Sequence, residues 1–293
     1  MHKYLRAIGF SNIKIREQLK PYIREVVTAP DRTEISEEDS EDIFVQVYKE
    51  YAEGMGLVMC GIVNEQEEFE LEYYYPTFFG NGVTSKENIV VEPHADKESY
   101  AGVCEDIKVG VSLIFFLQNV CEYKNEQRIH RVRNKGIDTT LSALSICGKI
   151  LLPIDKTKKQ IEITREATKN RNQLMEAARN GDENAIESLT LEDMDTYSMI
   201  SRRIVHEDIL SLVDNYFMPY GVECDKYSVM GEIEDCNLVK NKDTGEKIYK
   251  LTINTNELIF DVCINEQDLL GEPAKGRRFK GNIWLQGRIN YDY

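Results

Sequence analysis

The chain lacks the long apolar segments that membrane-spanning helices need. Its longest apolar run lies around residues 111–117, whereas a helix needs about 20 apolar residues to cross a bilayer. The first residues, MHKYLR, are not followed by the apolar stretch of a secretory signal peptide. We therefore expect a soluble protein that stays in the cytoplasm.

Cysteine pairs are also missing. The seven cysteines lie at positions 60, 104, 121, 147, 224, 236 and 263, and none forms a Cys-x-x-Cys motif. An odd number without paired spacing argues against a disulfide framework and fits a reducing compartment. No histidine-based dyad pattern accompanies these cysteines, so we interpret them as buried, inert thiols.

Common catalytic and nucleotide-binding motifs are absent as well. Residues 276–281 (GRRFKG) have the glycine spacing of a phosphate-binding loop, but Asn282 stands where the lysine belongs and no strand-to-helix pattern follows. Residues 80–82 lack the third glycine of a dinucleotide motif, and no Gly-x-Ser-x-Gly motif occurs. The sequence favours a non-catalytic protein with no cofactor, while leaving an enzyme open.

Positive charge is scarce. The formal net charge is −15, from 51 Asp and Glu against 36 Lys and Arg. Such a chain repels a polyanion at long range, which disfavours nucleic acid as a partner. Residues 34–42 are almost wholly acidic, whereas residues 124–135 and 275–280 are basic islands that keep a local anion site open.

The chain is long enough for two packed cores. Residues 1–154 begin with a helical pattern and continue with alternating strands from Ile43, which predicts an α+β domain with an antiparallel sheet. Residues 155–220 are rich in charge and almost free of turn residues up to Gly181, where a helix C-cap is predicted. They form a helical connector in this interpretation.

Residues 221–293 predict a small β-barrel. Several short apolar strands alternate with turn signals, among them a hairpin candidate at residues 243–245. Closing the sheet removes the exposed edges that promote aggregation, so an OB-like or SH3-like barrel is expected. Trp284, the single tryptophan, lies between Gly281 and Gly287 and is interpreted as a core anchor.

Three segments carry a resemblance to a known family. They are residues 1–11 (MHKYLRAIGFS), 110–113 (GVSL) and 178–182 (ARNGD). In these segments and in its layout the chain resembles an uncharacterised family of cytoplasmic proteins from Gram-positive anaerobic bacteria, defined as a domain of unknown function. The resemblance covers nearly the whole chain. It implies a bacterial cytoplasmic protein, and it implies no activity, cofactor or catalytic residue.

One cluster could hold a metal ion. Glu92, His94 and Asp96 are spaced two apart, which places them on one face if the segment is a strand, and they offer oxygen and nitrogen ligands. A metal site would need a further, distant ligand such as His130 or His206. The same spacing is common in solvated turns, so the sequence favours a surface turn over a metal-dependent hydrolase.

A second cluster could contact nucleic acid. Lys275, Arg277, Arg278 and Lys280 lie close to two aromatic residues in the predicted barrel. Oligonucleotide-binding barrels combine a basic groove with aromatic faces on which bases stack. Residues 227–293 nevertheless contain nine Lys and Arg against eleven Asp and Glu, so the interpretation of a structural loop is favoured.

Aromatic residues are concentrated in residues 73–80 (YYYPTFFG), where a predicted strand passes into a loop. Tyr74 and Phe78 are the candidate interface residues, because aromatic side chains at loops are enriched in protein interfaces. Packing against the helical connector would bury the same residues equally well. The sequence leaves both interpretations open.

These observations favour a non-catalytic interaction or regulatory module in the cytoplasm, with a protein partner or self-association and no membrane contact. One alternative is a nucleic-acid-binding protein that uses the C-terminal barrel. A metal-dependent hydrolase built on Glu92, His94 and Asp96 is the other.

Overall fold

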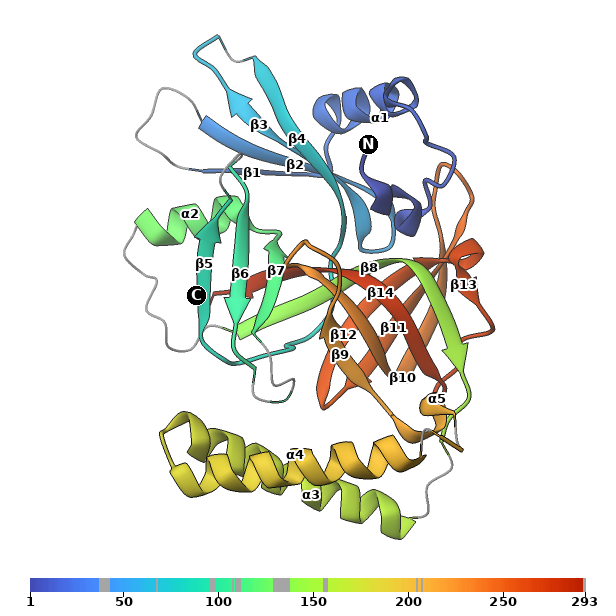
Figure 1. The fold of residues 1–293 in the computed structure, drawn as a ribbon. Helices are drawn as coiled ribbons and strands as arrows, with labels where there is room; N and C mark the ends of the chain where they lie inside the picture. Colours follow the sequence, from blue (N-terminus) through green and yellow to red (C-terminus); the bar gives the residue numbers. More distant parts are fainter. Residues whose placement is uncertain are drawn as a thin grey trace.

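The computed structural model describes residues 1–36, 43–66, 68–94, 98–106, 108, 112–128, 138–154, 158–203, 205, 206 and 208–291. They form a mixed α+β fold built around two sheets. Figure 1 shows a four-stranded sheet beside helix α1, a larger sheet that curls into a barrel, and a helical hairpin below them. The expected α+β class and the closed β-barrel are confirmed.

The four-stranded sheet is an antiparallel meander, as the sequence predicts. Its strands follow one another in the order of the chain: β1 (Arg32–Ile35), β2 (Ile43–Ala52), β3 (Met55–Val63) and β4 (Phe69–Phe78). Gly54 makes the tight turn between β2 and β3 with a φ of 71°, a left-handed conformation that favours glycine. Helix α1 (Arg16–Thr28) contacts β2 and β3.

The barrel is closed by five strands. They are β8 (Asp138–Leu151), β10 (Lys226–Lys240), β11 (Lys247–Thr255), β12 (Leu258–Asn265) and β14 (Arg278–Asn290). Around the wall the order is β8, β12, β11, β10, β14 and back to β8. The β8–β12 pair is parallel, and the other pairs are antiparallel.

One wall strand of the barrel lies outside the segment in which the sequence predicts it. Four strands come from residues 221–293, but β8 precedes the helical connector. It pairs with β14 on one side and β12 on the other, and this pairing closes the barrel. Strand β8 belongs to residues 1–154, which the sequence assigns to the α+β domain, and no local pattern indicated its long-range partners. The division of the chain into domains stays a prediction.

Strand β14 also joins the barrel to the remaining strands of the larger sheet. It pairs in parallel with β7 (Leu113–Leu117), which continues to β6 (Tyr100–Cys104) and β5 (Ile89–Pro93). Short strands β9 (Tyr216–Pro219) and β13 (Leu269–Leu270) pair with β10 and β8. Helix α2 (Val120–Arg128) follows β7 and lies near β1 and β2.

The remaining helices are the 3₁₀ helices η1 (Lys3–Ile8) and η2 (Glu266–Asp268), the hairpin α3 (Lys158–Arg179) and α4 (Glu183–Arg203), and the short α5 (Ile209–Leu212). Gly181, with a φ of 87°, ends α3 as the sequence predicts. The hairpin lies away from both sheets for most of its length (Figure 1). Among the helices described, none is long and apolar enough to span a membrane.

Buried glutamines join the four-stranded sheet to the barrel. Gln286 of β14 donates to the carbonyl of Pro76 at 2.9 Å, and its side-chain oxygen accepts from Gln118 at 3.0 Å. Gln118 also donates to Thr77 Oγ1 and to the carbonyl of Phe78, both at 2.9 Å. Because these residues are buried, unpairing any of these groups would cost the full desolvation of a polar group.

Four of the cysteines are buried thiols within the core: Cys60, Cys104, Cys121 and Cys263. Burial raises the pKa of each, to about 11 for Cys104 and to about 12 for Cys60. A raised pKa keeps these thiols protonated near neutrality, and thus poor nucleophiles. The structure therefore supports the interpretation of these four as inert core residues. The same interpretation is wrong for Cys147 and Cys224, which are exposed, and Cys236 is half-buried.

Stability should fall in alkaline solution because of these thiols. As the pH rises from about 9 to about 11, an unfolded Cys104 loses its proton while the folded form retains it, so the free energy of unfolding decreases. Urea unfolding across this range should show a shallower decrease for Cys104→Ala, equivalent to about one proton fewer released on unfolding. The control Cys147→Ala removes an exposed thiol and should keep the wild-type slope.

Candidate functional site

A cleft lies where the four-stranded sheet meets β14 and the start of α2. It has an inner niche of about 20 Å³ and an outer groove of about 300 Å³, and both are bounded by Phe79, Gln118 and Arg288. Arg32, Glu34, Gln46, Tyr48, Val58, Tyr75 and Asn119 complete the niche, and Gly80, Glu122, Thr140, Asn290 and Tyr291 complete the groove. We refer to the two compartments together as the arginine cleft.

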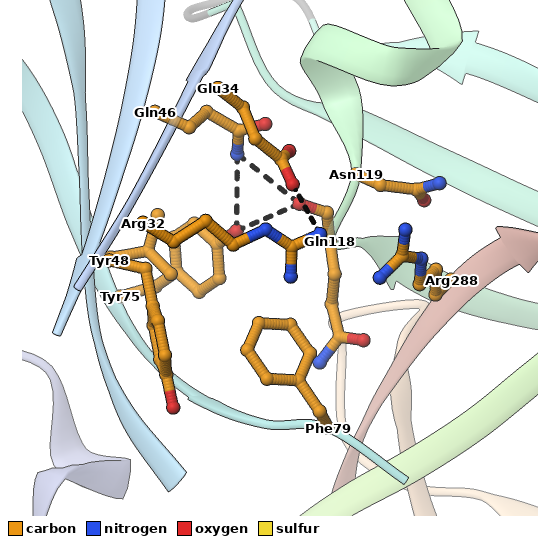
Figure 2. Close-up of a pocket in the computed structure, with 10 residues that line it drawn as sticks. Arg32, Glu34, Gln46, Tyr48, Tyr75, Phe79, Gln118, Asn119 and Arg288 are labelled. Atoms are coloured by element: carbon orange, nitrogen blue, oxygen red, sulfur yellow. Dashed lines mark hydrogen bonds and ion pairs between the residues drawn. The ribbon is translucent and has the colours of Figure 1, made fainter. Parts of the chain in front are cut away.

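Arg32 enters the cleft from β1. Its guanidinium pairs with Glu34, two residues further along the same strand, at 2.6 Å. It also lies over the ring of Phe79, 5.9 Å from the centroid, which is a cation–π distance. The side chain is 41% exposed, so it can still reach a ligand from solvent. Figure 2 shows Arg32 and Arg288 on either side of Gln118, with Phe79 below them.

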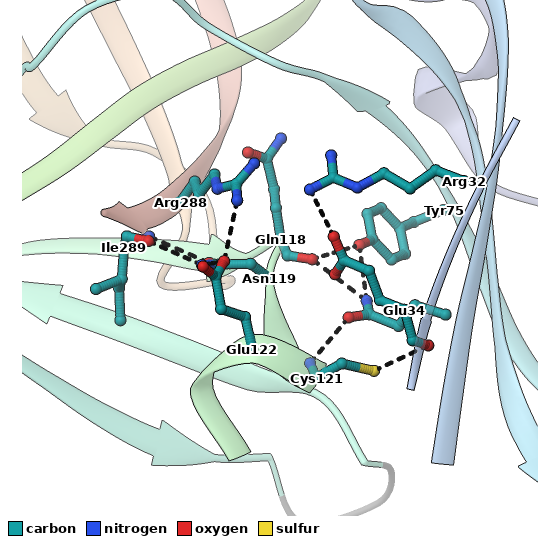
Figure 3. Close-up of polar contacts among 10 residues, drawn as sticks. Arg32, Glu34, Tyr75, Gln118, Asn119, Cys121, Glu122, Arg288 and Ile289 are labelled. Atoms are coloured by element: carbon teal, nitrogen blue, oxygen red, sulfur yellow. Dashed lines mark hydrogen bonds and ion pairs between the residues drawn. The ribbon is translucent and has the colours of Figure 1, made fainter. Parts of the chain in front are cut away.

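Arg288 enters from the opposite wall, on β14. It donates to Glu122 of α2 at 3.0 Å. Glu122 also accepts from the side-chain amide of Asn119 at 2.8 Å, and Asn119 exchanges hydrogen bonds with the backbone of Ile289 at 2.8 and 3.1 Å. Figure 3 shows this chain of contacts. It fixes the start of α2 against β14 and orients the carboxylate toward the arginine.

The floor of the niche is held by hydrogen bonds to one carbonyl group. The backbone oxygen of Gln118 accepts from Gln46 Nε2 at 3.3 Å and from the hydroxyl of Tyr75 at 3.2 Å. Gln46 also accepts from the backbone N–H of Cys121 at 3.1 Å, which satisfies a donor in the first turn of α2. The same residues thus connect β2, β4 and α2 beneath the cleft.

Tyr48 differs from Tyr75 in the hydrogen bonding of its hydroxyl group. Both side chains line the niche, but the buried hydroxyl of Tyr48 has no hydrogen-bond partner among the residues that the structure describes. Burial, followed by the nearby charge of Glu50, raises the pKa of Tyr48 well above its usual range, so the group is a neutral phenol. Its ring packs edge-on against Phe79, with centroids 5.0 Å apart. A polar group buried without a partner is unusual in a folded protein.

The side chains of the cleft offer positive charge and aromatic surface. Arg32 and Arg288 supply hydrogen-bond donors with a permanent positive charge, and Phe79 and Tyr48 supply aromatic surface between them. Cys60 and Cys121 both contact Gln46 of the niche, and both are buried, which raises the pKa of each thiol. This arrangement can hold a small molecule by ion pairing and stacking.

The predicted metal cluster is only partly described. Glu92 and His94 are exposed, at the end of β5 and just after it, while Asp96 and His130 lie outside the described residues. His94 Nδ1 lies 3.0 Å from Ser99 Oγ, and its ring lies 6.3 Å from that of Phe116. Within the described ranges, no three His, Cys, Asp or Glu side chains are grouped as metal ligands would be.

The four predicted basic contacts do not share one role. Arg278 is buried, and its guanidinium donates to the carbonyls of Leu152, Val213 and Leu210 at 3.1, 2.9 and 2.9 Å. Arg277 donates to the carbonyl of Glu272 in its own loop at 2.6 Å. Lys275 is exposed, and Lys280 is half-buried. Arg278 therefore holds backbone segments together in this structure, which leaves its charge turned away from solvent.

The predicted aromatic interface is mostly internal. Phe78 is fully buried in the core, so the structure corrects its assignment as a surface contact. The reason is that β4, at the edge of the four-stranded sheet, packs against η1 and β8 and is bonded to β14 through Gln286, which accepts from the N–H of Phe78 at 3.3 Å. Tyr74 is half-buried, and its hydroxyl accepts from the backbone N–H of His2 at 3.2 Å.

A different surface is both apolar and exposed. Helix α4 carries Ile186, Leu191, Met194 and Tyr197, which are 48%, 56%, 62% and 75% exposed. At 100° per residue these positions fall within one arc of the helix. We refer to these four residues as the α4 stripe. Sequence reasoning missed it because acidic residues interrupt the stripe and the segment was assigned to an ordinary helical connector.

Sequence reasoning missed the arginine cleft as well. Arg32 and Arg288 lie near opposite ends of the chain, and neither belongs to a motif. No local signal could have joined them, since the cleft depends on how β1 and β14 meet in space.

The comparisons with known proteins identify a family. A family model described as "Domain of unknown function, E. rectale Gene description (DUF3881)" matches residues 5–287. The expected domain-of-unknown-function family, covering nearly the whole chain, is thereby confirmed. No curated protein and no solved structure matches the chain.

The two tyrosines of the niche should respond differently to loss of the hydroxyl. Tyr75→Phe removes the donor to Gln118 and the acceptor for Gln46 and should lower the free energy of unfolding by about 1–2 kcal/mol. Tyr48→Phe removes a hydroxyl without a partner in the described structure, and it should leave stability unchanged or slightly higher. Urea unfolding of both variants provides the measurement. Equal destabilisation would contradict the assignment.

Arg278 and Arg277 form a matched pair for the barrel. Arg278→Ala leaves three carbonyls without their donor and should destabilise the fold by about 3 kcal/mol. Arg277→Ala removes one exposed hydrogen bond within a loop and should cost less than about 1 kcal/mol. Thermal unfolding of the two variants tests this, and equal melting temperatures would argue against a structural role for Arg278.

Proposed function

The chain belongs to the DUF3881 family, and from that premise we propose that it is a non-catalytic interaction module that pairs with a second copy of itself through the α3–α4 hairpin. The observation that carries the proposal is the α4 stripe. Four large apolar side chains, each about half exposed or more, follow one side of a helix. Large apolar side chains that gather exposed on one side of a helix mark interaction sites in soluble proteins.

The hairpin is poorly covered by the rest of the molecule. In the part of α3 and α4 whose side chains are described, Ala185 is the one buried residue. The two helices pack on each other, and Arg171 of α3 pairs with Asp193 of α4 at 2.8 Å. Arg179 donates to the carbonyl of Glu105 at 3.3 Å and so ties the turn of the hairpin to the body. The outer face of α4 remains available to a partner.

The charges of the two helices favour a second copy as that partner. Helix α3 has six Lys and Arg against three Glu, which gives +3, whereas α4 has two Arg against five Asp and Glu, which gives −3. In a twofold-symmetric dimer, α3 of one copy can lie along α4 of the other, and α4 along α3. Opposite charges then face each other at both seams, as in a four-helix bundle.

The size of the hairpin is sufficient for a stable dimer. With 22 and 21 residues, each helix is about 30 Å long at a rise of about 1.5 Å per residue. Two helices side by side present a face of about 600 Å² per copy, or about 1,200 Å² in total, which reaches the lower end of specific interfaces.

The location of the protein is part of the same proposal. We infer a cytoplasmic protein because the seven cysteines are free thiols, four of them buried in the core. A reducing compartment is where such thiols persist. The support for this inference comes from the state of the cysteines and not from any targeting segment.

We also infer that the barrel is OB-like. Read from β10, the wall order is β10, β11, β12, β8, β14, which is a Greek-key order with one parallel pair. This is the order of an OB barrel with one difference. The strand in the place of the last OB strand is β8, which here precedes the other four strands in the chain. This order supports the nucleic-acid alternative, since OB barrels bind oligonucleotides on the face of their second and third strands.

The surroundings of that face weigh against the alternative. The N-terminal segment packs against β12 and β8, and Asn265 at the end of β12 donates to the carbonyl of Arg6 at 3.1 Å. The turn between β10 and β11 is engaged too, because Asn241 and Thr244 donate to the carbonyls of Ile8 and Gly9 at 2.9 and 2.7 Å. The self-association proposal therefore has the better support.

Removing the α4 stripe should dissociate the dimer. Leu191→Ser, Met194→Ser and Tyr197→Ser combined should raise the dimer Kd by at least about hundredfold, because a symmetric interface buries each side chain twice. Analytical ultracentrifugation of the full chain measures the change. Met199→Ser is the matched control, since Met199 is 55% exposed on the same helix but lies outside the arc of the stripe.

The effect of ionic strength on dimer formation provides a second test of the same proposal. Because the helices carry opposite net charge, raising the ionic strength should weaken the wild-type dimer moderately and should leave its apolar contacts in place. A wild-type chain that sediments as a monomer at about 100 µM, a concentration far above the Kd of specific dimers, would refute self-association.

A further inference from the structure

We propose that the arginine cleft binds a small organic oxyanion, a carboxylate or a phosphate ester, attached to a flat aromatic body. This inference is independent of self-association. The cleft is lined by residues of β1, β2, β4, β14 and the start of α2, whereas the α4 stripe belongs to the hairpin, which Figure 1 shows away from both sheets. The ligand class follows from the donors, the rings and the shape of the cleft.

The two arginines supply the recognition of an oxyanion. In the described part of the chain each pairs with one carboxylate, Arg32 with Glu34 and Arg288 with Glu122, although a guanidinium has five N–H donors. Their side chains are 41% and 33% exposed, so the remaining donors can reach a bound group. A guanidinium fork matches a carboxylate or phosphate in two parallel hydrogen bonds.

The carboxylates in the cleft are already engaged, which favours an anion over a cation as the ligand. Glu122 accepts from Arg288 and Asn119. It also lies in the first turn of α2, where the helix dipole adds positive potential. A cationic ligand would have to displace Arg288 and Asn119 from Glu122. An anion can instead bind the guanidinium N–H groups that the ion pairs do not use.

Phe79 determines the shape of the ligand. It is half-buried and borders both the niche and the groove. Tyr48 packs against one edge of its ring and Arg32 lies over it, at 5.0 and 5.9 Å between centres. The groove beside Phe79 has about 300 Å³, the lower end of the size of small-molecule pockets. A flat ring can therefore lie in the groove with its charged group at Arg288.

The niche gives the ligand its anchor point. With about 20 Å³ it has room for one water-sized group, such as an oxygen of the ligand. Tyr48 lines the niche, but Figure 2 shows its hydroxyl pointing away from Gln118 and from both arginines, so the charged donors of the niche are the guanidinium groups of Arg32 and Arg288.

Fluorine NMR of the full chain tests the proposal with three probes. They are 4-fluorobenzoate, 4-fluorophenyl phosphate and the neutral isostere 4-fluorobenzamide. Both anions, or one of them, should bind more tightly than the amide, and the better anion identifies the carboxylate or the phosphate as the recognised group. Arg288→Gln and Arg32→Gln should each weaken that binding by about tenfold. The control Arg24→Gln removes an exposed arginine of α1 and should have no effect.

A second pair of variants separates binding from structural damage. Glu122→Gln and Glu34→Gln keep both arginines and remove the carboxylates that compete with the ligand, so the anions should bind several-fold more tightly. If the two ion pairs only stabilised the fold, the two glutamate variants would bind the anions more weakly, as the two arginine variants do.

Three results would overturn the proposal. They are equal binding of the amide and the anions, binding that survives both arginine substitutions, and glutamate variants that bind the anions more weakly than the wild type.

Discussion

The fold depends on a small set of buried amide hydrogen bonds between its two sheets. Gln286 of β14 and Gln118, just after β7, bond to each other and to the backbone of β4 at Pro76 and Phe78. Gln46 of β2 completes the set through the carbonyl of Gln118. An apolar contact would allow the sheets to slide, whereas these directional bonds specify one register. Each unpaired member would be costly, so the two sheets are held together as a unit.

The arginine cleft is a consequence of that constraint. Gln118 forms its floor with its backbone and part of its wall with its side chain. The same contacts hold β1 and β14 at the spacing that brings Arg32 and Arg288 into one cleft (Figure 2). A site supported by buried hydrogen bonds is preorganised, so little ordering is left for a ligand to impose. The hairpin has the opposite character, because it extends from the body and exposes its apolar side chains.

The sequence was a good guide wherever the signal was local. The alternation from Ile43 onward defined the meander, and Gly181 marked the end of α3. It was a poor guide to exposure. Phe78 and Arg278 were candidate surface contacts, yet Phe78 is buried in the core and Arg278 is drawn inward by three backbone carbonyls. Residue type sets a preference for burial, but the neighbour that covers a side chain is set by packing.

By itself the sequence determined the α+β class, the existence of a barrel, the helical hairpin and the shortage of positive charge, because period, turn residues and composition are properties of neighbouring positions. Tertiary structure alone decided that β8 closes the barrel between β12 and β14 and that Arg32 meets Arg288. It also decided which aromatic residues are covered. The physical reason is that strand pairing and burial join residues far apart in the chain, and the free energy of such contacts depends on the whole packed arrangement and leaves no local pattern.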